Sequence, residues 1–273
     1  HGGTIYQARK RLKWPGQAAV VVSVVHVAKG ELAGPFLLDN REAPIITAYL
    51  FHAGGHEDPA RLKANEDKSF IGSYVLGMGF TFDDTDKKGP ATPLAEMERL
   101  IAKDPRNKER IFRYIGGEEV NDSPTHAHHR YVINFEDFPL SRQNLGPSWQ
   151  DADDDQREEW LRAGLVPLDY PDPVAADWPD LLAIIEQKVK PDRLTDNREN
   201  YRRYWWQFAE RRPGLTLALR GLHEVITISR VTHQLAFTLL SAEMVHGESL
   251  VVVTCDDRTM QAVLQSRVHE IWA

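Results

Sequence analysis

The sequence has a single cysteine, Cys255, among 273 residues. One thiol excludes internal disulfide bonds and any zinc site built on cysteines. Long apolar runs are also missing: the longest, residues 18–25, is interrupted by Ser23 and has the length of a strand, far short of the about 18 residues that a membrane span needs. The basic residues 9–13 lead into Trp14-Pro15-Gly16 rather than an apolar segment. We therefore expect no signal peptide and a cytoplasmic location.

An excess of positive charge is missing as well, because 33 Lys and Arg face 40 Asp and Glu, for a net charge of −7. Phosphate binding requires Lys and Arg, so this total argues against a nucleic-acid partner. The distribution changes that argument. Residues 141–180 contain 10 acids and 3 bases, a balance of −7, which leaves 30 of each in the rest of the chain. One acidic segment carries the whole imbalance, and the remainder has enough bases for a basic face.

Motifs for methyl transfer are absent. A DNA amino-methyltransferase needs a glycine-rich loop for the methyl donor and an Asp/Asn-Pro-Pro-aromatic loop for the flipped base, and the sequence has neither. The nearest glycine pattern, Gly77-Met78-Gly79-Phe80, does not follow a strand and open a helix, so we interpret it as a structural turn. We expect this chain to catalyse no methyl transfer by itself.

Two other chemical patterns are weak. Pro179-Asp180 and Glu186-Gln187-Lys188 superficially spell a metal-dependent nuclease, but all five residues fall on one expected helix, whereas such a nuclease brings its carboxylates together from strands. His126, His128 and His129 have no acidic or cysteine partner at a ligand-like spacing, so a solvated or phosphate-touching loop is the preferred interpretation. Cys255 is interpreted as a packed thiol. We expect no catalytic residue and no metal site.

Apolar periodicity predicts an α+β fold, with mixed short-stranded sheets and several packed helices. One helix is expected to begin at Thr92-Pro93 and end at Asp104-Pro105, because an N-cap residue precedes a proline at the first helical position. Two further strands, 111–115 and 130–135, are expected around a turn at Gly116-Gly117. The remaining expected strands are residues 17–27, 45–51, 69–82, 224–231, 234–240 and 249–254, and the remaining expected helices are residues 177–189, 198–211 and 259–272.

Arginines alternate with aromatic residues over residues 198–212. Such a mixture suits contacts with phosphates and bases. Tyr201, Tyr204, Trp205 and Phe208 have the spacing of a buried helix face, so Tyr201 and Trp205 are expected in the core. The flanking arginines either pair with carboxylates near the core or face DNA, and the sequence leaves both alternatives open.

Blocks of sequence in a fixed order resemble the specificity region of single-chain type IIG and IIL restriction–modification enzymes and of adenine-specific DNA methyltransferases in phage-defence systems. The blocks are Trp14-Pro15-Gly16-Gln17-Ala18-Ala19-Val20 and residues 69–82, 107–121, 130–135, 189–193, 201–213, 228–237, 264–266 and 269–273. Two departures accompany them. The acidic stretch 141–176 is longer than the family pattern, as an insertion would be, and the chain stops at 269–273, where relatives continue.

The resemblance implies a target recognition domain that reads base edges of double-stranded DNA and presents an adenine to a separate catalytic domain for N6 methylation. Residues 1–55 would be the tail of the methyltransferase domain and a linker, and residues 56–273 a C-terminally truncated target recognition domain with the insertion at about 141–176. S-adenosylmethionine would be a cofactor of the parent enzyme and not of this fragment. The parent's catalytic domain would be a partner, and no membrane is implied.

The best candidates for base contact are Arg230, Thr232, His233 and Gln234, in a turn between two expected strands. Arg can fork onto guanine and Gln onto adenine. A plain hairpin turn with solvated polar residues is the alternative. The other DNA-binding candidates are Arg130, Arg198, Arg202 and Arg203. A second hypothesis is a protein–protein scaffold that joins a defence-system methyltransferase to partner subunits through the acidic segment.

Overall fold

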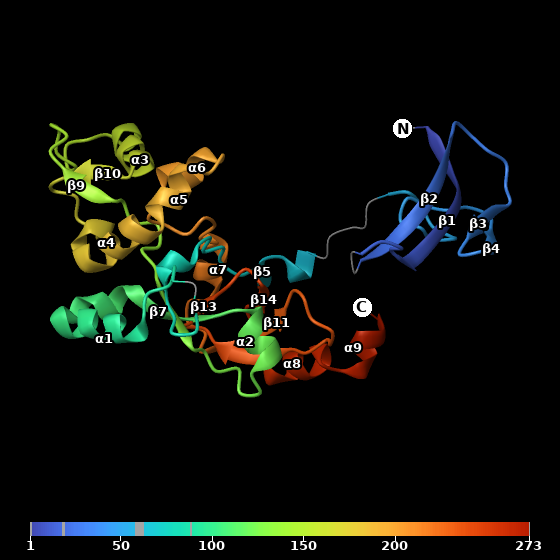
Figure 1. Cartoon of the computed structure of the whole chain (residues 1–273). Helices are drawn as coiled ribbons and strands as arrows, with labels where there is room; N and C mark the ends of the chain where they lie inside the picture. The colour runs from blue at the N-terminus through green and yellow to red at the C-terminus, as the bar shows by residue number, and fades with distance from the viewer. Residues whose placement is uncertain (1, 18–19, 58–62, 88, 273) are drawn as a thin grey trace. The chain divides into compact units, whose positions relative to one another are not determined.

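A computed structural model describes residues 2–17, 20–57, 63–87 and 89–272 (Figure 1). The chain divides into two compact units, His1–Lys63 and Ala64–Ala273, which we describe separately as the N-terminal and C-terminal units. Short strands in mixed sheets alternate with several helices, so the fold is α+β, as the sequence predicts. Among the described residues, no helix has the length and apolar character to cross a membrane.

The N-terminal unit contains one four-stranded sheet in the order β2-β1-β3-β4. Its small core includes Ala8 and Ile46. The expected strand over 45–51 is wrong, because these residues form a tight turn. The Thr47 N–H donates to the Phe51 carbonyl, and the Leu50 N–H donates to the Thr47 carbonyl. Leu50 has φ 58°, which lies outside the extended region. Ile46 therefore fills the core from a loop. The strands are β1 (Gly3–Lys13), β2 (Val21–Lys29), β3 (Phe36–Leu38) and β4 (Arg41–Ala43).

The C-terminal unit contains two four-stranded sheets, β12-β11-β14-β5 and β13-β7-β8-β6, and a two-stranded parallel pair, β9 with β10. All but two of the ladders in the unit are antiparallel; β13 with β7 and β10 with β9 are parallel. The strands are β5 (Ser69–Ile71), β6 (Thr81–Phe82), β7 (Ile111–Ile115), β8 (Arg130–Ile133), β9 (Ser141–Gln143), β10 (Leu165–Pro167), β11 (Glu224–Ser229), β12 (Thr238–Ser241), β13 (Val245–His246) and β14 (Leu250–Val253).

Local signals place the first helix well. Helix α1 (Leu94–Lys103) ends at Asp104, as expected, but Pro93 occupies the N-cap position instead of the first helical position, so Thr92 does not cap the helix. The expected helix over 177–189 is α4 (Pro179–Lys188). The other helices are α2 (Gly117–Asp122), α3 (Asp154–Ala163), α5 (Lys190–Leu194), α6 (Glu199–Arg203), α7 (Pro213–Ala218), α8 (Arg258–Leu264) and α9 (Arg267–Trp272).

Three helical expectations need correction. The helix expected over 198–211 ends at Arg203, because residues 205–208 are all buried and four consecutive buried side chains do not fit one helix face. The closing helix is interrupted at Gln265-Ser266 and forms α8 and α9. The turn expected at Gly116-Gly117 is instead the start of α2.

The main core lies between the β13-β7-β8-β6 sheet and helices α1 and α4, which are neighbours in Figure 1. Tyr201 and Trp205 are buried, as their spacing predicts. The indole of Trp206 is 2% exposed and donates to the Phe138 carbonyl over 2.9 Å. The largest almost fully buried members of this core are Phe80, Phe82, Ile133, Phe135, Leu181, Ile185 and Trp206, and Trp178 and Trp205 are nearly as buried.

The acidic segment 141–176 is folded rather than a loose surface loop. It includes β9, α3 and β10, and the side chains of Trp160, Val166 and Val174 form a core of their own. Gly164 ends α3 with φ 73°, and a Cβ there would lie 2.6 Å from the Trp206 ring, so the segment packs closely on the main core. Its acids face outward on α3.

Candidate nucleic-acid interface

The polar residues singled out in the sequence lie in the loop between β11 and β12, residues 230–237, which we call the β11–β12 loop. Thr232, His233 and Gln234 are exposed. The backbone N–H of Gln234 donates to the Thr232 hydroxyl oxygen over 3.3 Å. Among the described residues, the side chains of Thr232 and Gln234 form no other hydrogen bond or ion pair with the protein. These three side chains are therefore available to a ligand.

Arg230 anchors the start of this loop. Its N–H donates to the Ser249 carbonyl over 2.8 Å, and its Nη1 donates to the Glu248 carbonyl over 3.0 Å. Both partners belong to the turn before β14. The side chain is exposed and has no carboxylate partner among the described residues, so the guanidinium keeps donors for another acceptor.

Beside the loop is an open hollow of about 580 Å³, which we call the loop hollow. Its other wall comes from the end of α2 and from the segment that follows, and contains Asn121, Asp122 and His126. Gln265, after α8, closes it from a third side. Amide, imidazole and hydroxyl groups thus surround a space open to solvent, and these are groups that hydrogen-bond base edges.

Helix α2 is held tightly at its start. Gly117 donates to the Ser249 hydroxyl over 2.7 Å, and a Cβ at Gly117 would lie 2.7 Å from Ser229 Oγ, so only glycine fits this approach. Glu119 accepts from the Gly116 N–H through Oε2 over 2.9 Å. The glycine pair therefore brings the helix onto the ends of β11 and β14.

Arg130 does not face solvent. Its guanidinium contacts Glu119 Oε1 at 2.6 Å, and the two side chains are 12% and 2% exposed. The ring of Tyr114 lies 5.0 Å below it. Because its charge is committed to a buried carboxylate, we leave Arg130 out of the proposed contact surface and place it among the groups that hold α2.

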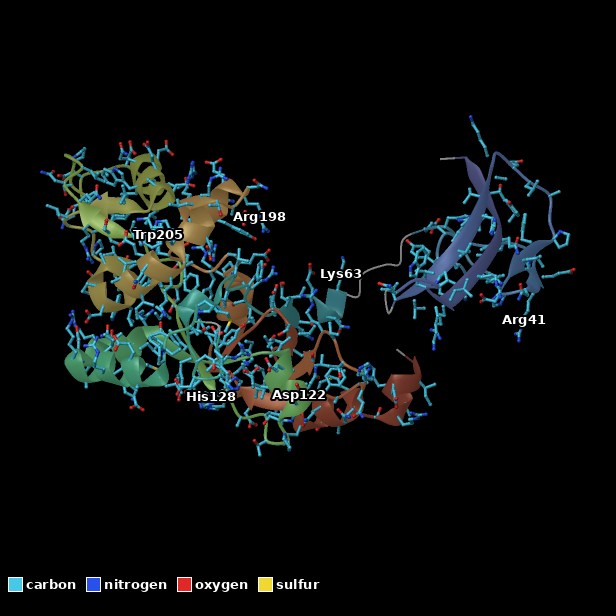
Figure 2. The ribbon with its side chains drawn as sticks, viewed as in Figure 1. Arg41, Lys63, Asp122, His128, Arg198 and Trp205 are labelled. Carbon is cyan, nitrogen blue, oxygen red and sulfur yellow. The ribbon has the colours of Figure 1, made fainter. Side chains whose placement is uncertain are left out.

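The arginines of α6 lie elsewhere. Arg198 stacks over Tyr201 at 4.1 Å and pairs with Asp196, while Arg203 pairs with Glu199 across one helical turn. Arg202 donates to the Asp196 carbonyl. Figure 2 shows Arg198 well apart from Asp122 at the loop hollow. The structure thus brings Arg230, Thr232, His233 and Gln234 together and leaves the α6 arginines, each with a protein partner, on another part of the unit.

Sequence reasoning missed Asn121, Gln265 and Arg193. Arg193 lies in the 189–193 block and is 2% exposed; it donates to the Val75 carbonyl over 2.8 Å and lies 5.4 Å from the Tyr201 ring. Burial lowers the pKa of this guanidinium. No local spacing marks these residues, because their partners are distant in the sequence.

The glycine motif is a structural turn. Gly77 has φ 123°, and a Cβ at Gly79 would lie 2.8 Å from Val189 Cγ2 and 2.9 Å from the Lys188 carbonyl oxygen. The turn thus packs closely against Lys188 and Val189, and together with them it lines a hollow of about 190 Å³.

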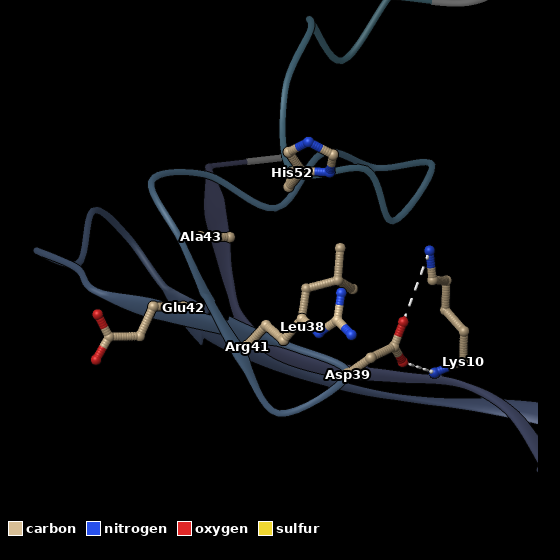
Figure 3. A pocket seen from close by; sticks show the side chains of 7 residues that line it. All are labelled: Lys10, Leu38, Asp39, Arg41, Glu42, Ala43 and His52. Carbon is tan, nitrogen blue, oxygen red and sulfur yellow. Dashed lines mark hydrogen bonds and ion pairs between the residues drawn. The ribbon is translucent and has the colours of Figure 1, made fainter.

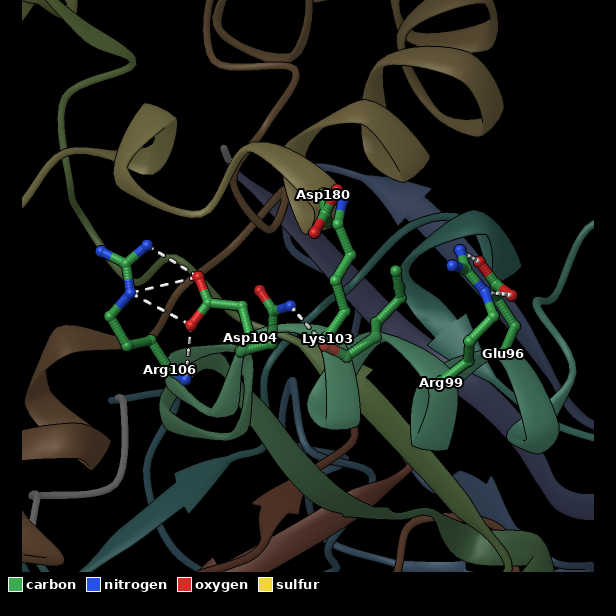
Figure 4. Close-up of polar contacts among 8 residues, drawn as sticks. Glu96, Arg99, Lys103, Asp104, Arg106 and Asp180 are labelled. Atoms are coloured by element: carbon green, nitrogen blue, oxygen red, sulfur yellow. Dashed lines mark hydrogen bonds and ion pairs between the residues drawn. The ribbon is translucent and has the colours of Figure 1, made fainter.

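The nuclease-like acid is also structural. Asp180, at the first turn of α4, accepts from Lys103 Nζ over 2.6 Å (Figure 4). Nearby, Arg106 donates to Asp104 and holds the pKa of that carboxyl below its usual range. These pairs tie α1 to α4 and close the end of α1.

The described residues contain no group of three or more His, Cys, Asp or Glu side chains that could hold a metal ion. Burial lowers the pKa of His128, whose ring packs edge-on against Tyr131 at 5.2 Å. His129 lies 3.5 Å from Glu119, and His126 lines the loop hollow. The three histidines point to different surroundings. Cys255 is a partly buried free thiol whose sulfur accepts from the Asp257 N–H.

A second open hollow, of about 550 Å³, lies in the N-terminal unit beside Lys10, Arg41 and His52 (Figure 3). Asp39 forms one side: it accepts from the Lys10 N–H over 2.7 Å and pairs with Lys10 Nζ at 3.7 Å. The mixed charges of this hollow do not favour one class of ligand.

The chain matches no protein-family model and no curated protein. Twelve chains of known structure resemble it. One is the type IIL restriction-modification enzyme MmeI, solved in complex with DNA, with 15% identity and a TM-score of 0.53 over 99% of this chain. The match covers 32% of that enzyme's chain. At this identity the likeness shows a shared fold: this chain folds like a part, about a third in length, of a restriction–modification enzyme.

Proposed function

We propose that this chain recognises double-stranded DNA in a sequence-specific manner and is not catalytic by itself. The observation that carries the proposal is the β11–β12 loop, which presents Thr232, His233 and Gln234 without competing protein partners beside the loop hollow. Arg230 is anchored to the turn before β14, with donors to spare. The fold it shares with part of an enzyme solved on DNA supports the same conclusion.

The parent is proposed to be an adenine-specific DNA methyltransferase of a restriction–modification system, with the methyl donor bound outside this chain. Exposed valines on strand β2 support the proposal that another part of the parent chain covers this strand. It pairs only with β1 among the described residues, and Val21, Val24 and Val27 are 65%, 43% and 60% exposed. Because strand neighbours alternate, these valines lie on both faces. A strand that is apolar on both faces is typical of a sheet covered on both sides.

We therefore assign the rest of the parent chain, its catalytic domain, as the cover of β2. Serine replacements at Val21 and Val27 are expected to weaken association with the separately expressed catalytic part. They are expected to leave DNA sequence selection by the 273-residue chain unchanged. Unaltered association would refute the assignment.

The proposed recognition is tested by selection from a randomised duplex pool with the 273-residue chain, followed by anisotropy titrations of the enriched duplex at several salt concentrations. We expect one enriched sequence, with affinity that falls as salt rises. Arg230→Ala or Gln234→Ala should weaken binding to the enriched duplex by about 1–3 kcal/mol, or about 5- to 150-fold, and relax preference at one position. Arg99→Ala, an exposed arginine on α1, is the matched control. If no sequence is enriched at low salt, the proposal is refuted.

A scaffold role is the second candidate, favoured by the outward acids of α3. Deleting 141–176 would damage the main core, so point changes are the better test. Replacing Asp155 and Glu159, both exposed on α3, by asparagine and glutamine should abolish capture of partner subunits if α3 is the docking site. Retained capture would reject this role for the acidic segment.

A further inference from the structure

We propose that Asn121 and Gln265 are positioning residues that hold the β11–β12 loop from two sides and thereby determine which sequence it selects. This inference rests on the proposed function. Neither side chain needs to touch DNA for this role, since both act through the backbone of the loop.

Asn121 holds the first half of the loop. It lies in the last turn of α2, and its Nδ2 donates to the Val231 carbonyl over 3.0 Å and to Ser229 Oγ over 3.3 Å. The same serine hydroxyl contacts the Val231 carbonyl over 3.0 Å. One amide thus joins the end of β11 to the first residues of the loop. Val231 itself is 84% exposed, so packing does not replace these hydrogen bonds.

Gln265 holds the second half. Its Oε1 accepts from the Phe237 N–H over 2.6 Å, and its Nε2 donates to the Leu235 carbonyl over 3.1 Å. Gln261, one turn earlier on α8, donates to the Phe237 carbonyl over 3.2 Å. None of the residues in α8 is buried, so amide hydrogen bonds account for much of what fixes the loop to this helix.

Between these two attachments, Thr232, His233 and Gln234 face solvent. The positions of these three side chains depend on where the loop backbone is fixed on either side of them. Discrimination between bases requires donors and acceptors within fractions of an ångström of the correct geometry, and a loose loop loses that discrimination before it loses attraction to phosphates. The two amides are therefore expected to control selectivity more than bulk affinity.

Helix α2, which carries Asn121, is itself fixed by contacts with more buried residues. Glu119, two residues before Asn121, is held by Arg130 and by the Gly116 N–H. Ser249 accepts from Gly117 through its hydroxyl and from Arg230 through its carbonyl. The helix that carries Asn121 and the start of the loop thus share one fixed point, Ser249, in the turn before β14.

The test uses the 273-residue chain with Asn121→Ala and with Gln265→Ala, each compared with an exposed residue of the same type, Asn65→Ala and Gln187→Ala. Urea unfolding checks that each variant folds. The readouts are enrichment from the randomised duplex pool and affinity for bulk duplex at low salt. We expect each variant to lose about 5- to 10-fold in the ratio of specific to bulk affinity, about 1 kcal/mol, with bulk affinity changed less than about twofold.

A double substitution separates positioning from general damage. In a Gln234→Ala background, Asn121→Ala should cost little further selectivity, because the contact it positions is already gone. Gln265→Glu keeps the acceptor for the Phe237 N–H and should restore part of the selectivity lost in Gln265→Ala.

Three results overturn the inference. Variants that select the wild-type sequence with unchanged enrichment would show that the amides do not position the loop. Equal losses of specific and bulk affinity would indicate general damage. A wild-type chain that enriches no sequence would refute the proposed function and this inference together, whereas the first two results leave the proposed function standing.

Discussion

Arg130 and Glu119 form the most buried ion pair among the described residues of the chain: both the Nε and the Nη2 of the arginine approach Glu119 Oε1, at 2.7 and 2.6 Å. The second carboxylate oxygen accepts from the Gly116 N–H over 2.9 Å. Every oxygen of this buried carboxylate therefore has a partner. The pair connects β8 to the start of α2.

Arg130→Ala is expected to lower the free energy of unfolding by about 3–5 kcal/mol, because it leaves the Glu119 carboxylate buried without its cation. Denaturant unfolding of the C-terminal unit measures this loss. Arg203→Ala, which removes an exposed pair with Glu199, should change the same quantity by about 0.5 kcal/mol or less. Equal effects would mean that burial of the first pair contributes nothing.

Because His246 is buried, we expect the free energy of unfolding to depend on pH. His246 is 2% exposed, and burial lowers its pKa to about 4. An unfolded histidine titrates near pH 6.5, so below that pH the unfolded chain binds more protons than the folded one. This contribution to stability is complete above about pH 7 and falls as pH drops from 6.5 toward 4, by about 3 kcal/mol in total.

His246→Leu should remove that part of the pH dependence, and urea unfolding between pH 7 and 4.5 measures it. His223→Leu, at an exposed histidine, should retain it. A wild-type slope in the His246→Leu variant would contradict the prediction.

Gly79→Ala should destabilise the C-terminal unit by about 1–3 kcal/mol, because the added Cβ overlaps the end of α4. Thermal unfolding measures the change. Gln187→Ala, at an exposed position on α4 in the same unit, is the control and should change the stability little. A neutral Gly79→Ala would mean that the end of α4 moves aside to accommodate the added methyl group.

Trp160→Ala should loosen the acidic segment and leave the main core ordered. Trp160 is 7% exposed and packs in the segment's own core against Val166 and Val174. Hydrogen exchange of peptides from 145–170 should rise, whereas peptides from β7 and β8 stay protected. Leu161→Ala, at a neighbour that is 42% exposed, should change neither.

Local signals predicted part of the fold because they act within one or two turns of chain. The Thr92-Pro93 start and the Asp104-Pro105 end define α1, and the apolar run 111–115 is β7. The same reasoning failed at 45–51 and beyond Arg203, where apolar residues fill the core from a loop or a turn. The spacing of apolar residues predicts which side chains are buried. The backbone conformation that buries them depends on how distant segments pack together.

At the candidate site, the sequence by itself indicated which side chains to consider as DNA contacts: a polar turn at 230–234 and arginines at 130, 198, 202 and 203. It also determined the absence of disulfides and the confinement of excess acid to one segment. The tertiary structure decided which of these groups remain available. Arg130 is taken by Glu119, the α6 arginines have partners of their own, and amides from α2 and α8 hold the β11–β12 loop. Those partners lie between 2 and 110 residues away along the chain, and the distant ones meet only because of how helices and sheets pack.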